Sequence, residues 1–127
     1  MAKKSSSESE ARKECKFYVN ASVKDFKNSI LWHMERSLAR ATVRATSRDW
    51  WLATAMAVRD EIMGRFISTM SRQYKANSKR VYYLSLEYLM GRLTEDTLTN
   101  SGLMDVARGA LKELGLDFDS IMASEVD

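Results

Sequence analysis

Three residues of this chain have the types and the spacing to do chemistry together: Glu87, Gly91 and Arg92. The carboxylate of Glu87 could orient a hydroxyl-rich ligand, and the glycine could let the backbone come close to that ligand. The motif therefore indicates a ligand-binding role. An equally weighted alternative is structural, with Glu87 and Arg92 paired to each other or capping the helix that follows.

An apolar run directly before Glu87 must hold this motif in place. Residues 81–86 are β-branched, aromatic or aliphatic with a single serine, which predicts a β-strand over about 80–86, buried on both faces. In α/β enzymes, groups at the carboxyl end of such a strand face the ligand crevice. A lone strand needs hydrogen-bonding partners, and the sequence shows no second run of this quality. We therefore expect a mainly α fragment with one β-strand, the beginning of a larger α/β protein.

The rest of the chain shows helical periodicity. It contains no proline and only 5 glycines, so its first half has few turn-forming residues. Ser22 and Asp25 form a capping box for the first helix, and Ser47 is expected to cap the second, with Asp49 in its first turn. The apolar spacing predicts helices over about 22–38, 48–77, 94–100, 103–114 and 117–122.

Three segments are expected along the chain. Residues 1–20 offer little to bury and predict a disordered N-terminal arm. Residues 21–79 predict a two-helix N-terminal extension with a connector at 39–47, and residues 80–127 predict the start of the α/β domain. The long helix is expected to pack against more than one neighbour or another subunit. Its apolar stripe comprises Trp51, Ala55, Val58, Ile62, Phe66 and Thr69.

The charge distribution supports a second candidate function. The net charge is +3, but most lysines and arginines lie in the first 80 residues, and the remainder is acidic. A small helical module could use this basic half to bind nucleic acid or another polyanion. Charge runs on helices are usually exposed faces, and this alternative leaves the strand unexplained. The residues it would use are Arg48, Arg59, Arg65, Arg72, Lys75, Lys79 and Arg80.

Several other classes of site are not indicated. The sequence has no Walker loop, dinucleotide-binding glycine motif, zinc spacing or nucleophile elbow. His33 is the single histidine and predicts a packed or surface side chain rather than a metal ligand. Cys15 is the single cysteine, so no internal disulfide can form, and a lone thiol fits a reducing cytoplasm. With no signal-peptide core and no bilayer-length apolar run, we expect a cytoplasmic protein without a membrane span.

Five short motifs resemble the N-terminal region of the glycogen (α-glucan, maltodextrin) phosphorylases. Together they cover roughly residues 22–127, so the resemblance is specific although each piece is short. The longest is Lys-Arg-Val-Tyr-Tyr-Leu-Ser-Leu-Glu-Tyr-Leu-Met-Gly-Arg at 79–92. The others are Arg-Asp-Trp-Trp at 48–51, Val-Arg-Asp at 58–60, Gly-Arg-Phe-Ile at 64–67 and Leu-Gly-Leu-Asp at 114–117.

The resemblance implies a fold and an activity. Phosphorylases are much longer chains with two Rossmann-like domains of the glycosyltransferase-B type, commonly dimeric, with pyridoxal 5'-phosphate on a lysine in the C-terminal half. They transfer a glucosyl unit from an α-1,4-glucan to inorganic phosphate and release glucose 1-phosphate. By this resemblance Glu87, Gly91 and Arg92 lie on the cleft wall, and the Schiff-base lysine has no counterpart here. The segment alone is therefore expected to be an inactive, incomplete part of the enzyme.

Departures from the animal pattern bear on regulation. Tyr74 matches the tyrosine on which animal phosphorylases stack AMP, but residues 42–44 do not reproduce the partner residues that complete that site. Ser68 stands where an arginine for the regulatory phosphoserine would be expected, and Leu89 stands where animal enzymes have tyrosine. The resemblance therefore implies a bacterial-type enzyme without phosphorylation control, with Tyr74 a packed aromatic residue.

Overall fold

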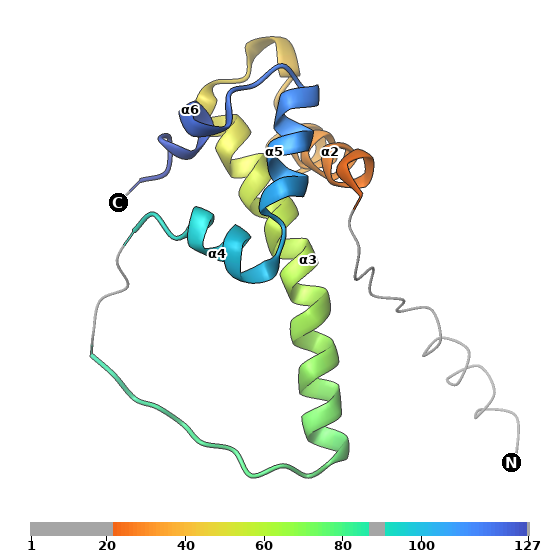
Figure 1. Ribbon diagram of the computed structural model, residues 1–127, viewed down its shortest axis with the longest axis vertical. Helices are drawn as coiled ribbons and strands as arrows, with labels where there is room; N and C mark the ends of the chain where they lie inside the picture. The colour runs from red at the N-terminus through yellow and green to blue at the C-terminus, as the bar shows by residue number, and fades with distance from the viewer. Residues whose placement is uncertain (1–21, 87–90, 127) are drawn as a thin grey trace, which may run out of the picture.

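The structure, a computed structural model, describes residues 22–86 and 91–126. The arm predicted for residues 1–20 and the predicted site residue Glu87 lie outside this part of the chain, as does Leu89. The described residues form helices and connecting segments (Figure 1). In order, these are α2 (Val23–Trp32), the π-helix η1 (His33–Ser37), the 3₁₀-helix η2 (Thr42–Arg44), α3 (Ser47–Lys75), α4 (Thr94–Ser101), α5 (Met104–Glu113) and α6 (Phe118–Met122).

The first helix follows the predicted pattern closely. The Ser22 hydroxyl accepts a hydrogen bond from the backbone N–H of Asp25 at 3.1 Å and donates one to its carboxylate at 2.7 Å. Phe26, Ile30 and Met34 are buried at the predicted three- to four-residue spacing. The helix continues from α2 through η1, so the prediction of a helix over about 22–38 is confirmed.

The cap of α3 corrects the prediction by one residue. Thr46, not Ser47, is the N-cap, and its hydroxyl accepts from the backbone N–H of Asp49 at 3.2 Å. The Asp49 carboxylate accepts from the Thr46 N–H in return, at 2.9 Å. Asp49 lies three residues after Thr46, the spacing that a capping box requires. These bonds, first that of the Thr46 backbone and then that of its hydroxyl, lower the pKa of the Asp49 carboxyl.

One hydrophobic core joins α2, the first half of α3, α5 and α6, with α4 packed against α3 and α5 (Figure 1). Helices α2 and α5 can approach closely because Gly109 faces Val23, whose Cγ2 would lie 3.1 Å from an added Cβ. The apolar side chains that are at most 1% exposed are Phe26, Ile30, Met34, Ala53, Ala57, Leu98, Ala107, Ala110 and Leu111.

The helix ends in the second half of the chain lie where the sequence predicts them. Gly102 and Gly115 both take left-handed backbone angles, with φ of 73° and 74°. After α5, Leu116 donates its N–H to the Leu111 carbonyl and Gly115 donates to that of Lys112, the bond pair of a Schellman motif. Both glycine breaks are therefore confirmed, and so is the predicted cap of α6 by Asp117.

Helix α3 has two halves with different surroundings. At 29 residues it is about 44 Å long, and its second half runs beyond the other helices (Figure 1). The predicted apolar stripe holds as far as Ile62, which packs on the core, but fails at Phe66, which is 55% exposed. The buried face centres on Trp50, Ala53 and Ala57, because the neighbouring helices cover only this end of α3.

The predicted strand is wrong for the described residues. Residues 78–86 have no regular secondary structure and run as an extended segment away from the end of α3 (Figure 1). Val81, Tyr82, Tyr83, Leu84 and Leu86 are each at least 79% exposed. A strand forms only where a second strand supplies hydrogen-bond partners, and the described part of the chain contains none. The mainly helical part of the fold-class prediction is confirmed.

Among the described residues, no helix combines the length and the apolar character needed to span a bilayer.

Candidate functional site

The structure places two of the three predicted cleft-wall residues directly before α4. Gly91 and Arg92 are both exposed, and Arg92 adopts a left-handed backbone with φ of 61°. This conformation costs a non-glycine residue roughly 1–2 kcal/mol, and such strained residues cluster at functional sites. Glu87 lies outside the described residues, and the cleft-wall assignment stays a prediction.

The start of α4 is held by a residue that the sequence did not indicate. The N-cap of α4 is Leu93, which has no side-chain acceptor to offer. Instead, the Glu125 carboxylate accepts from the Leu93 N–H at 2.9 Å and from the Thr94 N–H at 3.2 Å. Glu125 follows Leu93 by 32 positions, so no capping-box spacing could reveal it.

Two further bonds fix α4 against α3. The Trp51 indole donates to the Thr94 hydroxyl at 3.3 Å, close to the first turn. At the other end, the Arg65 guanidinium donates to the Ser101 carbonyl at 2.6 Å. A carboxylate at the N-terminus and a guanidinium at the C-terminus both complement the helix dipole. The element that follows Gly91 and Arg92 is therefore anchored at both ends.

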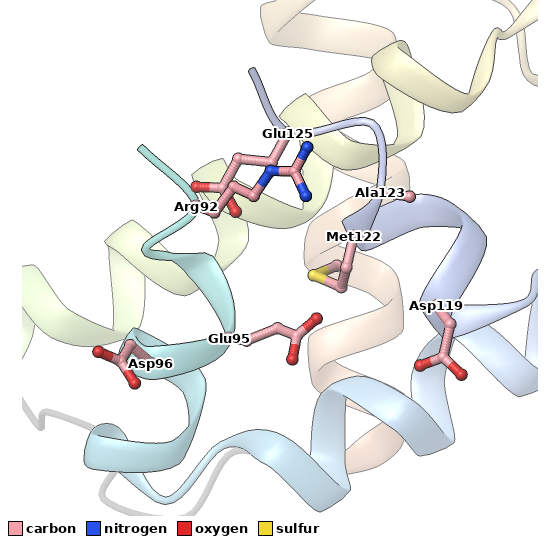
Figure 2. Close-up of a pocket in the computed structure, with 7 residues that line it drawn as sticks. All are labelled: Arg92, Glu95, Asp96, Asp119, Met122, Ala123 and Glu125. Carbon is pink, nitrogen blue, oxygen red and sulfur yellow. The ribbon is translucent and has the colours of Figure 1, made fainter. Parts of the chain in front are cut away.

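A pocket of about 470 Å³ opens beside Arg92, between α4 and α6 (Figure 2). The Glu95 carboxylate points into it from α4, whereas that of Asp96 points away. Its charged lining is one arginine and four carboxylates, so the pocket is acidic. In the part of the chain described, no group of three or more histidine, cysteine or acidic side chains could hold a metal ion. The lining residues are Arg92, Glu95, Asp96, Asp119, Met122, Ala123 and Glu125.

Tyr74 lies on the last turn of α3, away from the core. Its side chain is 80% exposed, so the prediction of a packed aromatic residue is wrong in this chain. It borders an open pocket of about 530 Å³ that is also lined by Lys75 and Arg80. Its role as an effector-binding residue is untested and stays a prediction.

His33 is buried, as a packed histidine should be, and its exposed fraction is 6%. Its Nε2 lies 2.9 Å from a carboxylate oxygen of Asp60, and its Nδ1 lies 2.9 Å from the Ser37 hydroxyl. The Trp32 ring packs edge-on against it, with 4.9 Å between ring centroids. Both ring nitrogens are engaged, so this histidine ties η1 to α3.

Comparisons with known proteins identify the family. No family model matches the chain. Over 105 residues, or 83% of the chain, it is 40% identical to the brain form of glycogen phosphorylase from Bos taurus and to the liver form from Homo sapiens. Glycogen phosphorylase from Pasteurella multocida is 37% identical over the same length. The chain spans only 12–13% of the length of these relatives.

Animal and bacterial relatives match at similar identity, so the bacterial-type subclass stays a prediction. The alignment covers most of the chain at an identity well above what unrelated sequences share, and the names of these relatives agree. This chain therefore belongs to the glycogen phosphorylase family.

Proposed function

We propose that the chain forms part of an α-1,4-glucan phosphorylase, which uses inorganic phosphate to release glucose 1-phosphate from glycogen or maltodextrin. The observation that carries the proposal is the 37–40% identity over 83% of the chain to glycogen phosphorylases of animals and a bacterium. Because the chain spans about an eighth of their length, the reaction needs residues outside it. The segment alone is expected to be inactive.

Within that enzyme, this chain supplies one wall of the substrate cleft. Glu87 orients glucan or phosphate oxygens, Gly91 lets the backbone approach, and Arg92 contributes positive charge beside an anionic reactant. The support for this assignment is the position of Gly91 and Arg92 before an anchored helix, α4, and the left-handed backbone of Arg92. Rigid support of this kind keeps reacting groups aligned.

Pyridoxal 5'-phosphate is the cofactor that this family implies, held on a lysine outside the chain. The pocket beside α4 does not suit its phosphate group, because its lining carries more acidic side chains than basic ones and the Glu95 carboxylate points into it. No residue of this chain is therefore assigned to the cofactor.

The remaining protein would also complete the fold. In the proposed two-domain, Rossmann-like enzyme, other strands would cover the exposed residues 81–86 and pair with their backbone. We further propose a bacterial-type, cytoplasmic homodimer, with the exposed second half of α3 turned toward the partner subunit. The exposed Phe66 and Ile67 on that half support a covered surface in the assembled protein.

The nucleic-acid alternative gains no support. The relatives described above are all named glycogen phosphorylases, and none is named for nucleic-acid binding. A mobility shift of DNA or RNA by the chain that weakens steeply with added salt would revive this alternative.

The test is phosphate-dependent release of glucose 1-phosphate from maltodextrin by the gene product extended to the length of its relatives. We expect Glu87→Gln to lower kcat roughly 10²-fold through misplacement of the reacting groups, with an unchanged thermal melt. Glu35→Gln, which makes the same change on the exposed face of η1, should keep full activity. An inactive extended protein would contradict the proposed function, and unchanged turnover of Glu87→Gln would contradict only the cleft-wall role.

A further inference from the structure

The Glu125 carboxylate, from a distant part of the sequence, contacts the backbone directly after the Gly91–Arg92 motif. One carboxylate oxygen accepts from the N–H groups of both Leu93 and Thr94, and the second oxygen also accepts from Thr94. The distances are 2.9, 3.2 and 3.2 Å, all within the range of ordinary hydrogen bonds. These are the first two N–H groups after Arg92.

Local structure explains why this position needs an outside acceptor. The first N–H groups of a helix have no partner within the helix, and Leu93 cannot supply one. Thr94 is buried, so water cannot readily take the place of the carboxylate. Negative charge is also favourable at a helix N-terminus. Glu125 thus satisfies the start of α4 and fixes the backbone immediately after Arg92.

We propose that Glu125 is a positioning residue for phosphorolysis, an inference that rests on the proposed function. It holds residues 92–94 in the conformation that gives Arg92 its left-handed backbone, and so sets the direction in which the arginine side chain leaves the chain. Figure 2 shows Arg92 and Glu125 lining the same pocket. Glu125 acts through the backbone of Leu93 and Thr94 and needs no contact with substrate.

Removal of Glu125 should loosen the motif without unfolding the protein. Helix α4 keeps the buried Leu98, the bond from Trp51 to Thr94 and the bond from Arg65 to Ser101. The expected change is confined to the first turn of α4 and to Arg92. That separation makes the positioning role testable apart from stability.

The first measurement is amide hydrogen exchange in the 127-residue chain. In Glu125→Ala we expect exchange at Leu93 and Thr94 to quicken roughly fivefold, the effect of losing a helix cap. Glu125→Gln, whose amide oxygen can still accept, should fall between this variant and the wild type. Asp105→Asn is the matched control, because it removes a charge from the first turn of α5. Unchanged exchange at Leu93 and Thr94 in Glu125→Ala would overturn the proposal.

The second measurement is steady-state phosphorolysis by the extended protein. We expect Glu125→Ala to lower kcat about tenfold with little change in the KM for maltodextrin. The kcat of Glu125→Gln should lie between those of Glu125→Ala and the wild type. The control Asp105→Asn should keep the wild-type kcat. If Glu125→Ala lost its helical circular dichroism signal, the kcat of Glu125→Gln would be compared with that of the wild type instead. If the wild type is active and both Glu125 variants keep its kcat, the positioning role of Glu125 is overturned and the proposed function stands. An inactive wild type overturns the proposed function and this inference with it.

Discussion

At the scale of single residues, the choice between Thr46 and Ser47 shows how a small spacing decides a helix start. Both hydroxyl residues could cap α3, and Ser47 was the expected cap. The residue three positions after Thr46 is Asp49, which returns a bond, whereas the residue three after Ser47 is Trp50, which has no acceptor. The capping-box spacing was visible in the sequence, so this correction was available from local rules.

We predict that Thr46→Ala lowers the free energy of unfolding by about 1 kcal/mol, the usual loss for a helix cap. Ser47→Ala should leave it nearly unchanged, since Ser47 is already inside the helix and exposed. Urea denaturation followed by circular dichroism measures both. Equal losses for the two variants would contradict the assignment of Thr46 as the cap.

A second residue prediction concerns Glu61, on α3. Partial burial raises the pKa of its carboxyl, and Arg65 opposes this only in part. A raised pKa means that the folded chain binds this proton more tightly than the unfolded chain, so ionised Glu61 destabilises the fold at neutral pH. Glu61→Gln should therefore raise the melting temperature at neutral pH. The gain should shrink as the pH falls through the raised pKa, because Glu61 of the wild type is then protonated and uncharged, like the glutamine that replaces it.

Thermal melts across an acid-to-neutral pH series test this prediction. Glu35→Gln on η1 serves as the control for loss of one negative charge on an exposed surface. A gain from Glu61→Gln that is the same at every pH would show that the substitution acts through something other than ionisation.

Glu125 marks the limit of reading a site from sequence. Gly91 and Arg92 could be named from their types and spacing, but the carboxylate that holds the next two N–H groups comes from 31 and 32 residues away. Only the fold that brings the segment after α6 beside α4 creates this contact. In the sequence, Glu125 was merely one of several acidic residues in the second half.

At the scale of elements, the helices were predictable and the extent of the core was not. Their bounds follow from caps, glycine breaks and apolar spacing, which are local. How far along α3 the core extends depends on where α2, α5 and α6 end. Phe66 belongs to the predicted apolar stripe of α3, as Ile62 does, yet Phe66 and its neighbour Ile67 are more than half exposed.

This difference gives an element-scale prediction. Leu111→Ala, on the fully buried face of α5, should cost about 2–5 kcal/mol through lost burial and a cavity. Phe66→Ala, on the exposed half of α3, should change stability by less than about 0.5 kcal/mol. Urea denaturation of the chain measures both. A loss at Phe66 comparable to that at Leu111 would show that this half of α3 is covered in solution.

The failed strand prediction has a different physical cause. Residues 81–86 have the composition of a buried strand, but strand structure belongs to a pair of segments rather than to one. The described residues contain no second strand, so this segment is extended and exposed. The composition of a segment does not show whether a second strand lies beside it.

At the scale of the whole molecule, a closed helical core carries an uncovered apolar ribbon. The ribbon consists of residues 81–86, and residues 22–86 and 91–126 contain no strand that could pair with it. Exposed edges of this kind pair with other chains. The 127-residue chain should therefore self-associate through this ribbon.

We predict that Leu84→Lys, which places a charge in the ribbon, lowers the fraction of oligomer at a given chain concentration. Asn100→Lys, at an exposed position on α4, is the matched control and should not change that fraction. Sedimentation velocity over a concentration series measures the association. A chain that stays monomeric at high concentration before any substitution would contradict the prediction.

The two anchors of α4 also set an order of events as the chain is made. Arg65 leaves the ribosome well before α4, so the acceptor at Ser101 meets its donor at once. The Glu125 carboxylate is added only after α5 and α6 have been translated. During that interval Trp51 and Arg65 can already hold α4 against α3, and the acceptor for the Leu93 and Thr94 N–H groups arrives only when Glu125 has left the ribosome.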